Sequence, residues 1–264
     1  MPGHRARGWR RIATAVWGWP SNPQIFGSLE VDAEPILAAI ERIRQDTGAK
    51  VTVTHLVTRA VALMLSGAPW FNSRLTRGRF IPRDDVSVFV IVSTGGGRDL
   101  DGVKVSGADR KRAHEIATEL SERSGGLRRG EVVELERAKK LLQALPLPVL
   151  RVMLPLTAYL TTDLGLDLKA LGMPREAFGG AMVTSVGMFG LAEGFVPLAP
   201  LYRVPLIVLV GEVRTKPWVV EDRVEPRRVL PLTVTIDHRW VDGAGVADLA
   251  RPFTEYLADP LAYE

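Results

Sequence analysis

A histidine lies between two aspartates in the stretch TIDHRWVDG, residues 235–243. His238 follows an alternating run in which Val234 and Ile236 share its face, so we expect it where a strand ends. An imidazole has an ordinary pKa of about 6.5, and its neutral form accepts a proton near pH 7. The pattern therefore allows general-base chemistry at His238. A histidine that only closes the strand is the more frequent alternative.

Asp242 lies four residues beyond this histidine, past a sharp turn that Gly243 permits. A carboxylate in this position accepts hydrogen bonds or pairs with an arginine. We expect Asp242 to fix the conformation of the loop that presents His238.

The elements that would position these residues alternate between strands and helices. Strands are predicted at 26–32, 86–93, 206–213 and 227–238, and amphipathic helices at 33–47, 51–67, 109–120 and 246–257. We expect Thr54 to cap the helix at 51–67, which places His55 in its first turn and makes a catalytic role for His55 a minor alternative. The alternation is typical of an α/β fold, and no linker-like composition divides the chain. We therefore predict one domain over residues 1–264.

Composition excludes several chemistries. The 264 residues include no cysteine, which removes thiol nucleophiles, disulfides and iron–sulfur clusters. The four histidines, at positions 4, 55, 114 and 238, are far apart, so we predict no metal site. Absence of cysteine fits a reducing compartment, and the N-terminus lacks the apolar run of a signal peptide. We expect a cytoplasmic protein.

The net charge of +4 is a mild basic bias. Many of these residues fall on predicted solvated helix faces, and the sequence shows no helix-turn-helix pattern or RNA-binding aromatic motif. We expect no nucleic-acid partner.

One apolar segment interrupts the alternation at about 133–178. Between Leu141 and Thr162 the only charged residue is Arg151. Three prolines within that run oppose a continuous membrane-spanning helix. We expect a helical insertion, a pair of short helices that pack on the domain or on a neighbouring subunit. Membrane contact through 141–162 is the less favoured alternative.

Several stretches together resemble a known family. DHRWVDG resembles the DHRxxDG signature of the catalytic domain of the 2-oxo-acid dehydrogenase acyltransferases, a group similar to chloramphenicol acetyltransferase. MVTSVGMFG (182–190) resembles the family's TISNLGMFG segment, and the stretches at 50–65 and 107–120 resemble two of its helices, KVTVNDLVIKAVALAL and NADRKSLLELAREI. These matches occur in the family's order and cover most of the chain outside 133–178.

The resemblance implies a two-layer α/β sandwich with a mixed sheet. It implies transfer of an acyl group between coenzyme A and a thiol of the dihydrolipoyl type, or another acceptor. His238 would be the general base, and Thr184 the hydroxyl that stabilises the oxyanion, with Ser185 a weaker candidate. Asp242 would be the structural carboxylate of the loop, with Arg10 or Arg11 as its partner. The family's active site lies between the subunits of a homotrimer, so the resemblance implies that this chain forms a homotrimer or a higher assembly.

The chain also departs from the family. Lipoyl and subunit-binding domains do not precede the core, so we expect no covalently bound lipoyl group on this chain and possible use of a separate lipoyl-carrying protein. GRDLDGVKVSG (97–107) replaces the family's DGLIVPVI region, which puts its substrate contacts in doubt. Trp240 is bulkier than the usual residue and is expected to narrow the channel mouth. The alternative function is a non-catalytic trimeric scaffold or a membrane-facing assembly protein. The sequence identifies neither the acyl group nor the acceptor.

Overall fold

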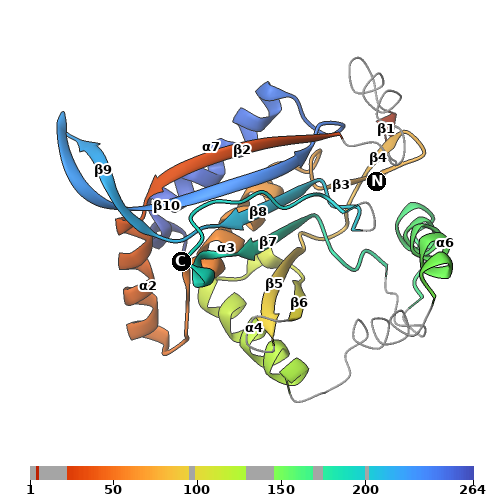
Figure 1. The fold of residues 1–264 in the computed structure, drawn as a ribbon, viewed down its shortest axis with the longest axis horizontal. Helices are drawn as coiled ribbons and strands as arrows, with labels where there is room; N and C mark the ends of the chain where they lie inside the picture. Colours follow the sequence, from red (N-terminus) through yellow and green to blue (C-terminus); the bar gives the residue numbers. More distant parts are fainter. Residues whose placement is uncertain (1–3, 6–22, 95–98, 129–145, 169–174, 200–201) are drawn as a thin grey trace.

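A computed structural model describes residues 4–5, 23–94, 99–128, 146–168, 175–199 and 202–264 (Figure 1). Within them, the α-helices are α2 (Glu34–Thr47), α3 (Val53–Gly67), α4 (Ala113–Arg128), α6 (Leu147–Ala158) and α7 (Gly243–Ala258). The strands are β1 (His4–Arg5), β2 (Gln24–Asp32), β3 (Ser73–Thr76), β4 (Arg79–Pro82), β5 (Val88–Thr94), β6 (Asp99–Val105), β7 (Ala181–Ser185), β8 (Leu206–Val210), β9 (Arg214–Val220) and β10 (Arg223–Asp237). Shorter helical turns are η2 (Ala108–Arg110), η3 (Tyr159–Asp163), η5 (Gly187–Phe189) and η6 (Pro260–Tyr263).

The main sheet is mixed, as predicted. Its strands follow the order β2-β10-β8-β7-β5-β6, and β9 pairs with the first half of β10. β7 is parallel to both β8 and β5, whereas the other neighbours are antiparallel. A small second sheet joins β1, β4 and β3. β9 and the first half of β10 form a hairpin that extends away from the body of the molecule (Figure 1).

Alternation along β10 sorts its side chains between the two faces of the sheet. Leu230, Leu232 and Ile236 belong to the main hydrophobic core, which they share with residues of α2, α3, α4 and α7. Thr233 and Thr235 are also buried but occupy the opposite positions of the pleat. The predicted alternation of side chains along this strand is confirmed. The face that carries Leu230, Leu232 and Ile236 is the one that the helices cover.

A smaller apolar cluster covers the other face. It consists of Phe89, Met182, Val204 and Ile207, against which Val196 and other side chains of the 178–202 region pack. This outer face therefore carries an irregular segment rather than a layer of helices, which makes the domain a two-layer sandwich.

Two predicted helix starts are wrong by a few residues. α3 is capped by Thr52 rather than Thr54, because Thr52 has an extended backbone and its N–H donates to Nδ1 of His55 at 3.0 Å. His55 thus closes a capping box, with an acceptor nitrogen in place of the usual Glu or Gln oxygen. α4 begins at Ala113, because Ala108–Arg110 form a separate 3₁₀ turn.

The described part of the apolar insertion is one helix, α6, followed by the π-helical turn η3; residues 133–145 and 169–174 of the predicted pair of short helices lie outside the described residues. Pro148 lies in the first turn of α6 and Pro155 lies inside it. Among the described residues, no helix has the length and hydropathy needed to cross a membrane. The interpretation of 133–178 as an insertion into a single domain stays a prediction.

Polar contacts attach this insertion to the body. Thr76 donates its hydroxyl to the carbonyl of Asp163 at 3.0 Å, and Arg74 donates to the carbonyl of Thr162 at 3.2 Å. The Asp163 carboxylate lies 3.0 Å from the guanidinium of Arg203. Burial raises the pKa of Asp163, although Arg203 opposes the shift. Arginine contacts of this kind hold η3 in place beside β3.

Candidate active site

His238 is the first residue beyond β10, because the strand ends at Asp237. Its backbone N–H donates to the carbonyl of Pro23 at 2.7 Å, and the N–H of Asp237 donates to the carbonyl of Pro205 at 2.9 Å. These two bonds fix the end of the strand. The residue is partly exposed while its Nδ1 atom is shielded from solvent. The exposed surface of His238 therefore belongs to other atoms of the residue.

Asp237 and Arg239 form a tight pair on either side of the histidine. The Arg239 side chain donates from Nε to Oδ1 at 3.0 Å and from Nη2 to Oδ2 at 2.6 Å, and its backbone N–H donates to Oδ1 at 2.9 Å. A fork of charge-assisted bonds between residues two apart restricts the backbone of the residue between them. Sequence reasoning missed this pair. Its signal is the DxR spacing at the end of a strand.

Trp240 does not narrow a channel mouth in this protomer, so that expectation is wrong. The residue is 5% exposed, its indole N–H donates to the hydroxyl of Ser73 at 3.1 Å, and its ring meets Phe80 edge-on at 5.5 Å. Because a large amphipathic ring gains most by burying its surface and satisfying its N–H, this tryptophan anchors the turn in the core.

Asp242 is the N-cap of α7. Its Oδ1 accepts a hydrogen bond from the backbone N–H of Gly245 at 3.0 Å, and its own carbonyl accepts from Val246 at 2.9 Å. The carboxylate also lies where a helix dipole favours negative charge. Asp242 thereby ties the loop that begins at His238 to the start of the helix. Arg10 and Arg11, its expected partners, lie outside the described residues.

Thr184 lies on β7, at the other end of the sheet from His238. Register pairs Thr184 with Leu209, and Leu209 with Thr233, so these three residues form one row across the sheet. His238 is five residues beyond Thr233. At about 3.3 Å per residue along β10 and about 4.8 Å for each of two strand spacings, the two side chains are roughly 19 Å apart in one protomer. The structure does not bring them together within one chain.

Thr184 shares the outer face of the sheet with Met182, whereas Ser185 alternates to the face of Val183, which belongs to the main core. The two neighbouring hydroxyls therefore lie on opposite faces of the sheet. Thr184 is 9% exposed. A small hydroxyl with little exposed surface at the end of a strand is suited to a narrow contact, such as one with a substrate oxygen.

Large apolar side chains follow Thr184 and remain exposed: Met188 at 69%, Phe189 at 49%, Leu191 at 52% and Phe195 at 49%. We call these four residues the 188–195 patch. Their segment passes close over the end of β8, since a Cβ atom on Gly187 would lie 2.7 Å from the carbonyl oxygen of Gly211. Neighbouring apolar side chains this exposed are typical of a protein–protein interface.

Metal ligands do not converge within the described residues. No group of three or more histidine, aspartate or glutamate side chains lies close enough there to hold an ion.

Solved structures with the same fold are acyltransferases by name. A probable dihydrolipoamide acetyltransferase from Listeria monocytogenes superposes with a TM-score of 0.67 at 19% identity, over 94% of this chain and 88% of that one. A chloramphenicol acetyltransferase superposes with a TM-score of 0.52 at 12% identity, over 97% of this chain and 100% of that one. The sheet and its helices therefore form the chloramphenicol-acetyltransferase-like fold that the sequence predicted.

The family follows from a sequence match. The family model described as 2-oxoacid dehydrogenases acyltransferase (catalytic domain) matches residues 10–137 and 173–263. The chain therefore belongs to this family. The dihydrolipoyllysine-residue acetyltransferase component of the pyruvate dehydrogenase complex from Zymomonas mobilis is 21% identical over 243 residues, which are 90% of this chain and 45% of that protein. The chain thus spans less than half the length of this relative.

Proposed function

We propose that this protein is a coenzyme A-dependent acyltransferase whose active site forms between the subunits of a homotrimer. The observation that carries the proposal is the placement of the two candidate side chains at opposite ends of one sheet. His238 stands on a turn fixed by Asp237, Arg239 and Asp242, whereas Thr184 is the penultimate residue of β7, just before an exposed apolar patch. A rotated copy of the chain brings the threonine end of one protomer against the histidine end of the next.

His238 acts as the general base in the proposed reaction. Its imidazole takes the proton of the attacking thiol, and the thiolate adds to the thioester carbonyl. The tetrahedral intermediate then expels the second thiolate, which recovers the proton from the imidazolium. The Thr184 hydroxyl of the neighbouring protomer donates a hydrogen bond to the oxyanion. One well-aimed donor of this kind lowers the activation free energy by about 3 kcal/mol.

The proposed substrates are an acyl-coenzyme A, or coenzyme A itself, and a thiol of the dihydrolipoyl type. The relative from Zymomonas mobilis is named for acetyl transfer to a dihydrolipoyl-lysine residue. A separate lipoyl-carrying protein is the proposed acceptor or donor for this chain, in the cytoplasm. Asp242 contributes by holding the loop, as the N-cap of α7.

Thiol release tests the proposal. Acetyl-coenzyme A is mixed with dihydrolipoamide, and free coenzyme A is followed for wild type, His238→Ala and His114→Ala. Loss of a general base lowers the rate by roughly 10²- to 10⁴-fold, so we expect that loss in His238→Ala. His114 lies on α4, far along the chain from the site, and His114→Ala should match wild type. Equal slow release by all three proteins, with acetyl-coenzyme A and with octanoyl-coenzyme A alike, would exclude the enzyme.

The alternative function is a non-catalytic scaffold or membrane-facing assembly protein. One observation favours it: Val149, Val152, Leu156 and Tyr159 form an exposed stripe along α6 and η3. Residues three or four apart lie on one side of a helix, so the stripe is a continuous apolar surface. A scaffold predicts that release of coenzyme A is independent of His238, whereas substitutions on the stripe alter assembly or vesicle binding.

A further inference from the structure

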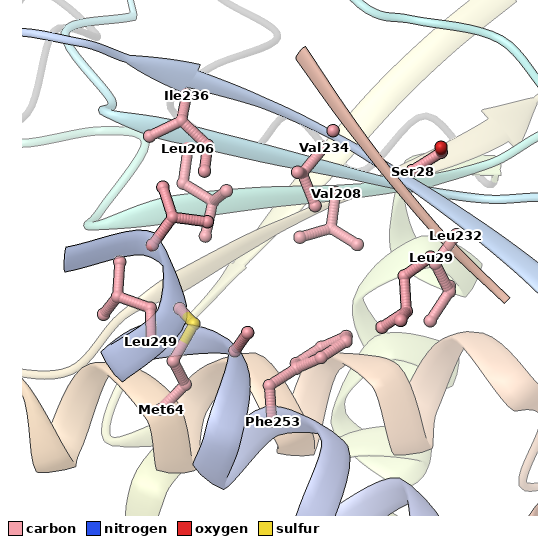
Figure 2. A pocket seen from close by; sticks show the side chains of 13 residues that line it. Ser28, Leu29, Met64, Leu206, Val208, Leu232, Val234, Ile236, Leu249 and Phe253 are labelled. Atoms are coloured by element: carbon pink, nitrogen blue, oxygen red, sulfur yellow. The ribbon is translucent and has the colours of Figure 1, made fainter. Parts of the chain in front are cut away.

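An apolar cavity lies inside the domain, between the helix-covered face of the sheet and helices α3 and α7. Its volume is about 190 Å³. Figure 2 shows Ile236, Leu206 and Leu249 at one end and Leu232 and Leu29 at the other. The remaining lining residues are Gly27, Ser28, Met64, Val208, Val234, Val246, Ala250 and Phe253.

The cavity runs parallel to β10. Leu232, Val234 and Ile236 occupy alternate positions of that strand and all line it. Four residues of extended strand span about 13 Å. The space is therefore elongated, which suits a chain-like ligand better than a compact one.

Gly27 leaves part of this space open. It pairs with Val234 across the sheet, and a Cβ atom at Gly27 would lie 3.1 Å from Cγ2 of Val234. Any larger side chain here would occupy the cavity. The cavity also reaches the surface beside α7, because Ala250 is exposed and Val246 is only half-buried.

The cavity meets the His238 turn at both of its flanks. Ile236 lies two residues before His238, and Val246 lies four residues after Asp242, whose carbonyl accepts the N–H of Val246 at 2.9 Å. The opening beside the first two turns of α7 therefore neighbours the loop that presents the imidazole.

The lining excludes charged ligands. Ser28 is the only lining residue with a polar side chain, and none carries a charge. Burying a carboxylate among such side chains without a partner is strongly unfavourable. An apolar chain, by contrast, gains from leaving water along its whole length.

We propose that this cavity binds the apolar tail of the transferred acyl group, and that the substrate class is a medium-length acyl thioester rather than acetyl or succinyl. The inference rests on the proposed acyltransferase function and adds its acyl specificity. An engineered cavity of about 150 Å³ in another protein accepts benzene, so the space here holds a tail of about six to eight carbons. No rearrangement of the core is required.

Binding measurements without an acceptor thiol test the cavity separately from catalysis. Dissociation constants are measured calorimetrically for acetyl-, hexanoyl-, octanoyl- and succinyl-coenzyme A with wild-type protein. Burial of two or more methylene groups makes octanoyl-coenzyme A bind at least about tenfold more tightly than acetyl-coenzyme A. Succinyl-coenzyme A should bind no more tightly than acetyl-coenzyme A.

Three variants locate the effect. Gly27→Val fills the cavity from β2, and Ala250→Leu fills it from α7; both should reduce the octanoyl-to-acetyl preference to less than about threefold. Ala247→Leu adds the same side chain to an exposed position of α7 that does not line the cavity, and should keep the wild-type preference. Ala250→Leu also serves if Gly27→Val fails to fold, because Ala250 is exposed.

The outcomes separate the two proposals. A wild-type protein without chain-length preference, or a preference untouched by Gly27→Val and Ala250→Leu, overturns the cavity inference even if acetyl transfer occurs. Gly27→Val and Ala250→Leu could instead change the oligomer mass measured by light scattering and leave the octanoyl-to-acetyl preference unchanged. That result would assign the cavity to assembly and would also overturn the cavity inference. Tight octanoyl-coenzyme A binding with no His238-dependent transfer supports the cavity and rejects the acyltransferase.

Discussion

The turn after β10 carries His238, and β7 with the segment after it carries Thr184 and the 188–195 patch; the two regions differ in how far one chain completes their contacts. In the turn, Asp237 pairs with Arg239, Trp240 bonds to Ser73, and Asp242 caps α7. In the 188–195 patch, four large apolar side chains face solvent. The first region is stable within a protomer, whereas the second has the character of an interface.

This difference explains how an active site can be built from distant parts. A general base has to be held still, and the turn achieves this with local bonds. In the proposed site, Thr184 lies at the other end of the sheet and would reach His238 only from another copy, and the exposed patch beside it is suited to contact with that copy. The comparison therefore links the proposed chemistry to assembly.

Mixing two inactive proteins tests this division most directly. His238→Ala and Thr184→Val are each expected to be inactive as homotrimers. After subunit exchange in equal amounts, half of the histidine positions and half of the threonine positions are intact. If neighbouring subunits combine at random around the trimer, about a quarter of the sites regain both groups. Coenzyme A release should recover to about that fraction of wild type.

No recovery after exchange, with mixed trimers confirmed by mass spectrometry, would contradict a site shared between neighbouring subunits. An active Thr184→Val homotrimer would show that Thr184 has no catalytic part. Thr184→Ser is the control, because it keeps the hydroxyl and should retain most of the activity.

Charge in the 188–195 patch should break the assembly and leave the protomer folded. Phe189 is half-exposed, so Phe189→Asp costs the isolated chain little. An interface would have to bury the new carboxylate without a partner. We expect monomers by light scattering, native far-UV circular dichroism and loss of activity.

Val152→Asp is the matched control, since Val152 is exposed at 71% on α6. It should remain trimeric and active. Trimers in both variants would reject the patch as the interface, and monomers in both would extend the interface to α6.

A smaller effect is expected for interactions that one chain completes by itself, and the pH dependence of folding stability tests it. Burial, with a contribution from Arg44, lowers the pKa of His55 to about 4. Its ordinary value is about 6.5, so the unfolded state binds a proton first as the pH falls. Stability is full above about pH 6.5 and declines toward pH 4, with about 1–2 kcal/mol lost at pH 5.

His55→Gln keeps an acceptor in the capping box and removes the titration. Urea unfolding at pH 7 and pH 5 should show a smaller loss for this variant than for wild type. The same difference should persist in the Phe189→Asp background, because the contact lies within one protomer. Equal losses in wild type and His55→Gln would contradict the assigned role.

Local patterns predicted much of this molecule correctly. Alternation along β10 correctly predicted which side chains share each face of the strand, because side chains on a pleat point to alternate sides whatever surrounds them. The prediction for Trp240 was wrong, because it rested on the size of the side chain, whereas the fold buries this ring in the core. The prediction of Thr54 as the cap was also wrong, because either threonine suits a cap and the backbone at Thr52 decides between them.

The sequence by itself determined the family and the mixed α/β fold and supplied the candidate site residues, because these depend on residue type and short-range order along the chain. Only the tertiary structure decided that His238 and Thr184 lie at opposite ends of one sheet, that Asp237 pairs with Arg239, and that Gly27 leaves a cavity behind the histidine turn. These facts depend on strand register and on packing between segments far apart in the chain, which spacing along the sequence does not encode.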